Sequence, residues 1–433
     1  MSKFQISTFG CQMNKTDSER VASVFEQLDF VSTDDSTLAD YIILNACSVR
    51  QTAIDRIWGM AKGFIKMKKK RPLKVILTGC VLEEDKKKFE KLFDLVFNIQ
   101  EINKLYEFLQ QGFVEKQSDY LNIRPAYTTS FHAYVPIMTG CNNFCSYCVV
   151  PYVRHREKSR SVESVLSEVK DLIANGCKEI HLLGQNVNSY DPMDKEIFST
   201  ENPYKNNFAK LLWEINQLQG EFRINFSSAH PKDMTDDVID ALTLPKQMNY
   251  LHLALQSGDD DILKAMNRKY TTADYYKIIE KIRKVKPEIA LGTDIIVGFP
   301  GETEEQFQNT VNFYKKVRFD IIYHAMYSAR AGTASSKMED DVSLTEKKRR
   351  WRILQTLMEK MTLEINQKYL GQKVEVLIDT VSDEGLPSTR AGRVVLGNSS
   401  DMKRVQIKNS EYRIGQLVKV VVTDPQRWIL FSA

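Results

Sequence analysis

The sequence predicts an α/β protein in three parts: an open parallel α/β domain at 1–125, a partial or full (β/α) barrel at 126–368 and a small all-β barrel at 369–433. Apolar strand-like runs alternate with amphipathic helical stretches as far as about residue 340. Beyond them, short β-rich runs are separated by Gly, Asn, Ser and Asp. A chain of 433 residues is long enough to give two or three domains cores of their own.

In the first part, three predicted strands each lead into a cysteine, namely Cys11, Cys47 and Cys80. The helix after the first strand is expected to carry a capping box formed by Thr16 and Glu19. In an open parallel sheet the carboxyl ends of the strands form the ligand-binding edge. We therefore expect the three cysteines to share one site; the alternative is three small buried residues at strand ends.

The second part repeats βα units of a length that favours a parallel barrel. Its helices are expected near 161–175, where Gly176 stops the helix, and near 207–219, 235–243, 273–286 and 303–317, the last capped by Thr303 and Gln306. The stretch GCNNFCSYC, at 140–148, follows the first strand of this part. It therefore lies at the carboxyl end of a strand, where such barrels carry their chemistry.

A charged helix is predicted over 344–369, closed by Gly371. The β-rich runs that follow, at 373–379, 391–397, 403–409 and 416–424, predict the small barrel. No apolar run approaches the ~20 residues of a membrane span, and no signal peptide is recognised. A cytoplasmic protein is expected, so its seven cysteines indicate metal or redox chemistry rather than disulfides.

The three cysteines Cys141, Cys145 and Cys148 admit several interpretations. A zinc site needs a fourth ligand, and His155 has no paired ligand beside it. A disulfide leaves one thiol over, and a redox pair of Cys145 with Cys148 leaves Cys141 unexplained. A 4Fe–4S cluster held by three thiolates, with one iron open to a small molecule, explains all three, while structural zinc stays open as the alternative.

The pattern CxxxCxxC with Tyr147 before its last cysteine resembles the radical S-adenosylmethionine (SAM) superfamily, and the later stretch TDIIVGFPGET strengthens the likeness. The resemblance implies that SAM chelates the open iron and is cleaved to a deoxyadenosyl radical. It also implies SAM contacts at strand ends of the barrel. The candidate SAM residues are Tyr147, Gly184, Gln185, Asn186, Ser228, Gln256, Val297 and Gly298.

Nearly the whole chain resembles the methylthiotransferases, which have an N-terminal α/β domain, a radical SAM barrel and a small TRAM barrel. These enzymes replace a C–H bond by C–S–CH3. The resemblance implies that Cys11, Cys47 and Cys80 hold a second 4Fe–4S cluster that presents sulfur. It also implies two uses of SAM, as methyl donor and as radical source.

Within that family, the stretches LLGQNVNSY, SSAHPKD and LQSGDDDILKAMNRKYT resemble the branch that modifies isopentenyladenosine beside the anticodon of tRNA. The expected reaction places sulfur and methyl on carbon 2 of that base. His155 departs from the pattern, since relatives often have glycine there, and the last barrel matches TRAM loosely. The alternatives are threonylcarbamoyladenosine in tRNA, an aspartate of a ribosomal protein, or a non-catalytic zinc protein that binds RNA.

Basic runs at 66–71, 154–160 and 347–352 are interpreted as phosphate contacts, the alternative being solvated helix faces. His181, His252 and His324 lie inside apolar strands and are expected to be packed rather than ligating, and Cys177 to be structural. The expected partners are the anticodon stem-loop of tRNA, SAM, a sulfur source and an electron donor protein. The chain is expected to act as a monomer without a membrane.

Overall fold

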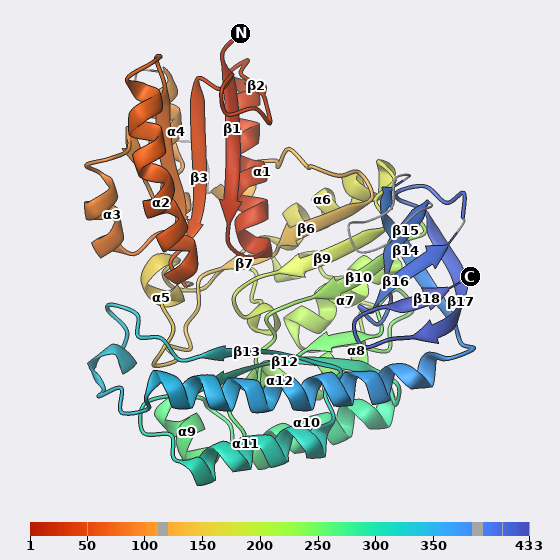
Figure 1. The fold of residues 1–433 in the computed structure, drawn as a ribbon. Coiled ribbons are helices and arrows are strands. Elements are labelled where there is room, and N and C mark those ends of the chain that lie inside the picture. Colours follow the sequence, from red (N-terminus) through yellow and green to blue (C-terminus); the bar gives the residue numbers. More distant parts are fainter. Residues whose placement is uncertain (50, 111–119, 383–392, 409, 433) are drawn as a thin grey trace.

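A computed structural model describes residues 1–49, 51–110, 120–382, 393–408 and 410–432. The N-terminal part is one parallel sheet with the strand order β2-β1-β3-β4-β5 (Figure 1). Helices α1 and α4 cover one face of it, and α2 and α3 the other. The bounds are β1 Lys3–Phe9, α1 Gln12–Gln27, β2 Val31–Ser32, β3 Tyr41–Cys47, α2 Gln51–Lys68, β4 Lys74–Cys80, α3 Glu83–Phe89, β5 Leu95–Val96 and α4 Asn103–Gln110.

The sheet is buried on both faces because its central strands are almost continuously apolar. Ile42 and Leu44 of β3 pack with α2, whereas Ile43 points to the opposite core beneath α1. This alternation is the two-residue period of a strand. A strand that is apolar at every position needs helices on both sides, and α1 and α2 supply them.

The start of α1 differs from the sequence prediction. The N-cap is Cys11, and a capping box joins it to Asn14, so Thr16 and Glu19 lie inside the helix rather than at its start. The hydroxyl of Thr16 donates to the Met13 carbonyl at 2.9 Å. The prediction was wrong because the helix begins directly after the strand. Cys11 occupies the N-cap position usually held by Ser or Thr, and Asn14 occupies the N3 position usually held by Glu or Gln.

The central part is a partial barrel. Strands β6-β9-β10 and β11-β12-β13 form two parallel sheets, joined by isolated bridges such as Ala229 to Leu253, and β6 and β13 are not paired to one another among the described residues. Its strands are β6 His132–Pro136, β9 Glu179–Leu183, β10 Arg223–Phe226, β11 Tyr250–His252, β12 Ala290–Val297 and β13 Ile321–Met326.

Helices cover the outside of this partial barrel and complete its large apolar core. The main ones are α6 Val162–Ala174, α7 Asn207–Gln217, α8 Asp236–Ala241, α10 Thr272–Val285 and α11 Glu304–Val317. The capping box of Thr303 and Gln306 on α11 is confirmed. Shorter elements near the cysteine stretch are β7 Met138–Thr139, α5 Val150–Val153, β8 Lys158–Ser159 and α9 Asp260–Ala265.

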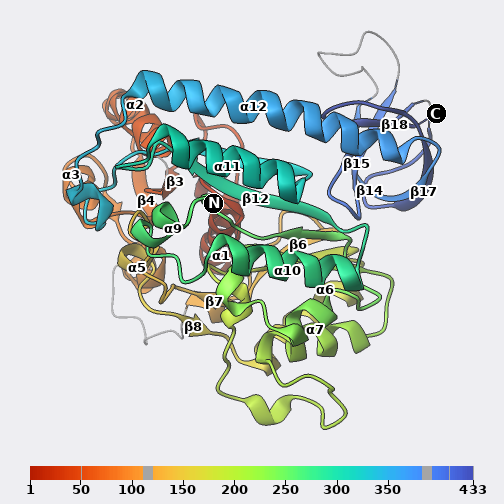
Figure 2. The ribbon, with the colours of Figure 1, turned by 90° about the horizontal axis from the view of Figure 1, so that it is seen from below.

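Helix α12, Leu344–Asn366, lies along α11 and leads to the C-terminal barrel (Figures 1 and 2). A single 3-10 turn extends it to Tyr369, and Gly371 follows with a φ of +74°. The predicted helix over 344–369 and its glycine stop are confirmed. None of the helices in the described ranges is long and apolar enough to cross a membrane.

The C-terminal part is a closed barrel with the strand order β14-β15-β16-β18-β17, as predicted. Its strands are β14 Lys373–Ser382, β15 Val394–Ser399, β16 Arg404–Lys408, β17 Leu417–Pro425 and β18 Leu430–Ser432; the predicted start at 391 and the predicted end at 409 lie outside the described residues. Lys403 pairs with Asp320 of the partial barrel at 2.7 Å, and the backbone amide of Asn249 donates to Ser400 at 3.0 Å. The barrel therefore docks near the amino ends of the central strands.

Candidate active site

Cys11, Cys47 and Cys80 meet at the carboxyl edge of the N-terminal sheet. Cys47 and Cys80 end β3 and β4 and are direct partners in the strand register. The Cys47 thiol is within hydrogen-bonding reach of both other thiols. These hydrogen bonds lower the pKa of Cys11 to about 6, lower the pKa of Cys80 and raise that of Cys47. Cys11 is exposed while the other two are buried, so the group of sulfurs is open on one side.

Two buried side chains and one glycine fix this first thiol group. Asn14 Oδ1 lies 3.4 Å from Cys11 Sγ, and Asn14 Nδ2 donates to Asn45 Oδ1 of β3 at 2.9 Å. Gly79 precedes Cys80 with a φ of +112°, and a Cβ there would lie 2.2 Å from the Ala46 carbonyl oxygen. Only glycine allows β4 to approach β3 this closely at the cysteines.

Cys141, Cys145 and Cys148 lie in the loop after β6 and β7, as predicted. The Cys141 amide donates to the His155 carbonyl at 3.1 Å, and the Cys148 amide donates to the Cys145 carbonyl at 2.9 Å. Burial raises the pKa of Cys141 and raises that of Cys148 to about 12. A metal ion bound here would displace the thiol protons and compensate the negative charge of the thiolates.

Arg268, which lies between α9 and α10, contacts this second thiol group. Its Nη1 donates to Cys145 Sγ at 3.2 Å, and its guanidinium carbon lies 5.0 Å from the centre of the Tyr270 ring. Asn267 donates to the carbonyl of Phe144, at 2.8 Å, and supports the loop backbone. The loop is therefore held in shape by protein contacts independent of any cofactor.

Arg154 connects the two thiol groups. Arg154 is joined to Cys148 through α5, which lies between them in the sequence. Its guanidinium is fully buried, and Nε donates a hydrogen bond to Cys80 Sγ at 2.8 Å. Its Nη2 lies 2.5 Å from Asp17 of α1, and its Nη1 donates to Tyr120 at 3.1 Å. Val149, the N-cap of α5, and Val153, the last residue of α5, pack on Cys80. The two thiol groups therefore come from elements in direct contact.

The sequence did not reveal this role of Arg154. It lies in the basic run 154–160, interpreted as phosphate-binding, and its partner Asp17 is 137 positions away. Arg160 of the same run is also buried and pairs with Glu168 at 2.6 Å. In the run 347–352, Lys347 and Arg350 are likewise buried, paired with Asp340 and Glu302. The interpretation as phosphate contacts is wrong for these four residues, because they are enclosed and already paired.

Most predicted SAM residues lie at the carboxyl ends of neighbouring barrel strands. Gln185 accepts from the Gly140 amide at 2.6 Å, directly beside Cys141. Asn186 is buried and donates to Asp233 at 2.8 Å, and its Oδ1 has no hydrogen-bond partner among the described residues. Gly184 precedes them, and a Cβ there would lie 2.5 Å from Met138. These residues form one surface next to the cysteine loop.

Two further candidates have unusual backbone. Ser228 and Gln256 have φ values of +67° and +73°, in the left-handed region that non-glycine residues rarely adopt. Such strain is concentrated at ligand sites, since the surrounding fold must hold it in place. Ser228 is joined to the Gln185 segment because its carbonyl accepts from Val187 at 3.4 Å. Gln256 forms a bridge with Ile295 of β12.

The remaining candidates are Val297, Gly298 and Tyr147. Val297 is fully buried in the barrel core, so only its backbone is available to a ligand. Gly298 donates to Glu302 at 2.6 Å, and a Cβ there would lie 2.4 Å from Lys347. Tyr147 packs in a small cluster with Phe299 and other apolar side chains. Among the strand-end candidates, Gln185 and Ser228 are partly or fully exposed. The others are buried, namely Gly184, Asn186, Gln256, Val297 and Gly298.

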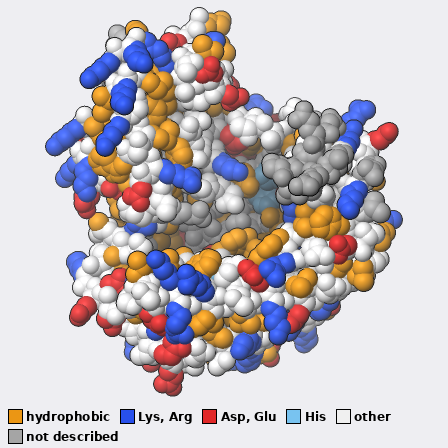
Figure 3. All heavy atoms as spheres, in the orientation of Figure 1, with side chains coloured by type: hydrophobic (Ala, Val, Ile, Leu, Met, Phe, Trp, Pro, Cys, Tyr) orange, Lys and Arg blue, Asp and Glu red, His pale blue; other side chains and the backbone are white. Residues whose placement is uncertain are grey.

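The three parts enclose a hollow on one face (Figure 3). A cavity of about 330 Å³ lies where α1, the amino ends of β6 and β9, and strands β14 and β15 approach one another. Its lining includes Lys15, Tyr134, His181 and Asp379. It is therefore bordered by all three parts of the chain.

Comparison with known proteins decides the family. The chain is 39% identical to the tRNA-2-methylthio-N(6)-dimethylallyladenosine synthase of Acetivibrio thermocellus, over 98% of this chain and 89% of that protein. It belongs to this family. The proteins of the same name from Clostridium novyi and Carboxydothermus hydrogenoformans are each 38% identical, over 99% and 97% of this chain and over 95% and 96% of their own lengths.

Two family models match parts of the chain, consistent with this membership. Residues 135–314 match the radical SAM superfamily, and residues 3–99 match the uncharacterized protein family UPF0004. The resemblance inferred from the cysteine motif is confirmed.

Solved structures support the fold. The cobalamin-dependent SAM radical enzyme OxsB aligns with a TM-score of 0.54 at 12% identity, over 91% of this chain and 64% of its own. The radical SAM methyltransferase TsrM from Kitasatospora setae aligns with a TM-score of 0.53 at 13% identity, over 75% of this chain and 72% of its own. At these identities the likeness concerns the fold alone.

Proposed function

We propose that this chain is a radical SAM methylthiotransferase that adds sulfur and a methyl group to carbon 2 of isopentenyladenosine, also called dimethylallyladenosine, next to the anticodon of tRNA. One observation carries the proposal: two groups of three cysteines lie on elements in direct contact, joined by Arg154, in a member of the synthase family.

The donor sets fit two 4Fe–4S clusters. Each group offers three thiols and no fourth cysteine, so each would leave one iron open. Cys141, Cys145 and Cys148 would hold the cluster that binds SAM, and Cys11, Cys47 and Cys80 the cluster that presents sulfur. The clusters and SAM would supply the radical chemistry, the sulfur atom and the methyl group.

The chain's own residues would position these groups. Arg154 and Arg268 each donate a hydrogen bond to one ligand sulfur, and such bonds to a thiolate stabilise its negative charge. The segment formed by Gly184, Gln185 and Asn186 would contact SAM. Asn186 Oδ1, which has no partner within the part of the chain that the structure describes, would accept a hydrogen bond from the ligand.

Each of the three parts of the chain would have its own role in the reaction. Residues 1–125 would carry the sulfur-presenting cluster, 126–368 the SAM site and 369–433 the RNA contact. A target base must leave its stack to reach the site, and a base in a single-stranded loop costs least to extrude. The first two parts would contact the RNA as well, through exposed lysines and arginines that reach phosphates, namely Lys66, Lys69, Lys70, Arg156, Lys158, Lys348 and Arg352.

Nucleoside mass spectrometry of tRNA from cells lacking this chain tests the substrate. We expect methylthio-isopentenyladenosine to disappear and isopentenyladenosine to accumulate, and both to return to normal when the gene is restored. An unchanged methylthio-isopentenyladenosine level would refute the assignment. The same data would reveal a change in threonylcarbamoyladenosine, and ribosomal protein masses would reveal a modified aspartate.

Cysteine variants test the two cluster roles. Cys141→Ala should abolish SAM cleavage, whereas Cys47→Ala should leave SAM cleavage but stop sulfur insertion. Cys177→Ala is the matched control, because Cys177 is buried, donates to the Glu179 carbonyl and lies in neither group. A colourless zinc protein without visible absorbance would favour the non-catalytic alternative.

The proposed setting is the cytoplasm, with the chain acting as a monomer. A sulfur source and an electron donor protein would complete the reaction, since each product molecule takes up one sulfur atom and SAM cleavage requires an electron. Size-exclusion chromatography with light scattering would test the monomer.

A further inference from the structure

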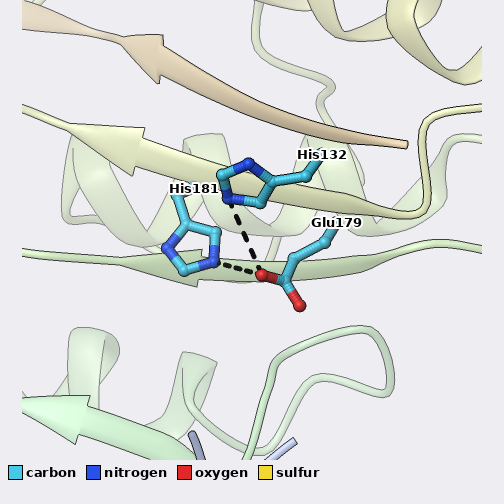
Figure 4. A group of neighbouring side chains, drawn as sticks. All are labelled: His132, Glu179 and His181. Carbon is cyan, nitrogen blue, oxygen red and sulfur yellow. Dashed lines mark hydrogen bonds and ion pairs between the residues drawn. The ribbon is translucent and has the colours of Figure 1, made fainter. Parts of the chain in front are cut away.

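His132, Glu179 and His181 face one another at the amino ends of β6 and β9 (Figure 4). His132 and Glu179 are direct register partners across the two strands, and Glu179 and His181 share one face of β9. Glu179 Oε1 lies 2.7 Å from His181 Nε2 and 3.8 Å from His132 Nε2. One ligand atom from each of the three residues lies within 4.8 Å of the other two.

These separations are close to those of a metal site. Two ligand atoms that are each about 2.1 Å from a zinc ion can lie at most about 4.2 Å apart. The spacing of 3.8 Å between His132 and Glu179 already satisfies this limit. Small side-chain rotations would widen the 2.7 Å contact of His181 and bring the two imidazoles onto a shared ion.

Arg223 orients the carboxylate without occupying the ligand atom. Its Nε and Nη2 lie 2.7 Å and 2.5 Å from Glu179 Oε2, which leaves Oε1 facing the two imidazoles. Carboxylates that bind metals are commonly held by such outer hydrogen bonds. Arg223 also donates to the carbonyl of Asn398 in β15, at 2.8 Å, so the site is connected to the C-terminal barrel.

The group has access to solvent. All three residues line the cavity of about 330 Å³ between the three parts of the chain. His132 is half-buried, while Glu179 and His181 are buried. An ion could therefore enter from the cavity and take water as a further ligand, as open zinc sites do.

We propose that His132, Glu179 and His181 form a binding site for a divalent transition-metal ion such as Zn²⁺. Two imidazoles and one carboxylate are a ligand set for this class of ion rather than for Mg²⁺ or Ca²⁺. The site lies at the strand ends opposite to the cysteines, so it is independent of the proposed function. His181 is buried, as expected for a packed side chain, and the proposed role as a ligand departs from the expectation that it does not bind a metal.

Metal content of the purified, iron–sulfur-reconstituted protein tests the proposal. The protein is equilibrated anaerobically with micromolar Zn²⁺ and desalted, and zinc and iron are measured by mass spectrometry. We expect one zinc per chain in the wild type and its loss in His132→Ala and His181→Ala, with iron unchanged. The matched control is His252→Ala, because His252 pairs with Asp294 at 3.4 Å elsewhere in the same barrel.

A second readout uses stability. Zinc should raise the melting temperature of the wild type and of the His252→Ala variant, but not that of His132→Ala. If His181→Ala does not fold, His132→Ala and His132→Gln decide, since His132 is half-buried and easier to replace. Absence of stoichiometric zinc from the wild type, or equal zinc in the His132 variants, would overturn the proposal and leave an ordinary hydrogen-bonded cluster.

Discussion

Replacing Arg154 by methionine should destabilise the carboxyl edge of the N-terminal sheet. The substitution removes the partner of Asp17, whose side chain is completely buried, and the hydrogen bond to Cys80 Sγ. Removing one member of a buried ion pair costs about 3–5 kcal/mol. Burial raises the pKa of Asp17, and the nearby positive charge of Arg20 opposes this rise. Because Arg20 would still compensate part of the Asp17 charge, we expect the lower end, about 3 kcal/mol.

Hydrogen exchange measured by mass spectrometry on the cluster-free protein would locate this loss. A loss of about 3 kcal/mol corresponds to roughly 100-fold faster exchange, since about 1.4 kcal/mol is tenfold, and it should appear in amides of β3 and β4. The double variant Arg154→Met/Asp17→Leu should recover most of the protection, because no buried charge is then left alone.

Arg124→Met is the matched control. Arg124 pairs with Asp171 at 3.2 Å, but both side chains are exposed, so its removal should leave exchange nearly unchanged. The reasoning would be refuted if Arg154→Met exchanged at the wild-type rate, or if the Asp17→Leu change failed to rescue it.

Three further outcomes are expected. Arg268→Met should lower the iron content and shift the potential of the SAM-binding cluster to more negative values in an EPR-monitored titration, because the hydrogen bond to Cys145 Sγ is lost. His155, at a φ of +59°, should accept glycine with little change in unfolding free energy, whereas His155→Val should cost about 1–2 kcal/mol in denaturant unfolding; equal stability of both variants would contradict this. Burial and the charges of Arg268 and Lys232 lower the pKa of His230 to about 2 in the folded protein. Below about pH 6.5 the unfolded chain therefore binds more protons than the folded protein, and the free energy of unfolding decreases as the pH is lowered. The His230→Asn variant should therefore show a flatter melting temperature between pH 7 and 5 than the wild type.

Periodicity and strand ends were sufficient to predict the architecture. The repeated pattern of a strand followed by a cysteine correctly predicted that Cys11, Cys47 and Cys80 lie close together. Parallel strands share a carboxyl edge whatever their distance in sequence. Gly371, which follows the end of α12, and the C-terminal barrel were also predictable. Both depend on signals within short stretches of sequence, namely a glycine after a helix and β-rich runs separated by turn residues.

Features that depend on distant partners were not predictable. Arg154 and Arg350 belong to basic runs in sequence, yet each is buried against a carboxylate from another element. Charge alone does not distinguish an exposed arginine from a paired one. His155 is a partial exception: glycine is expected there from the family resemblance, and its left-handed backbone explains that preference.

The packing of α5 on the first thiol group bears on how this enzyme could have been assembled from modules. A fragment ending before the barrel would keep the buried carboxylate of Asp17 but lose Arg154, together with the valines that shield Cys80. In such a fragment Arg20 would remain near the buried carboxylate, but the ion pair with Arg154 and the cover over Cys80 would both be missing. An independently stable N-terminal module would therefore have to include the segment that follows Cys148.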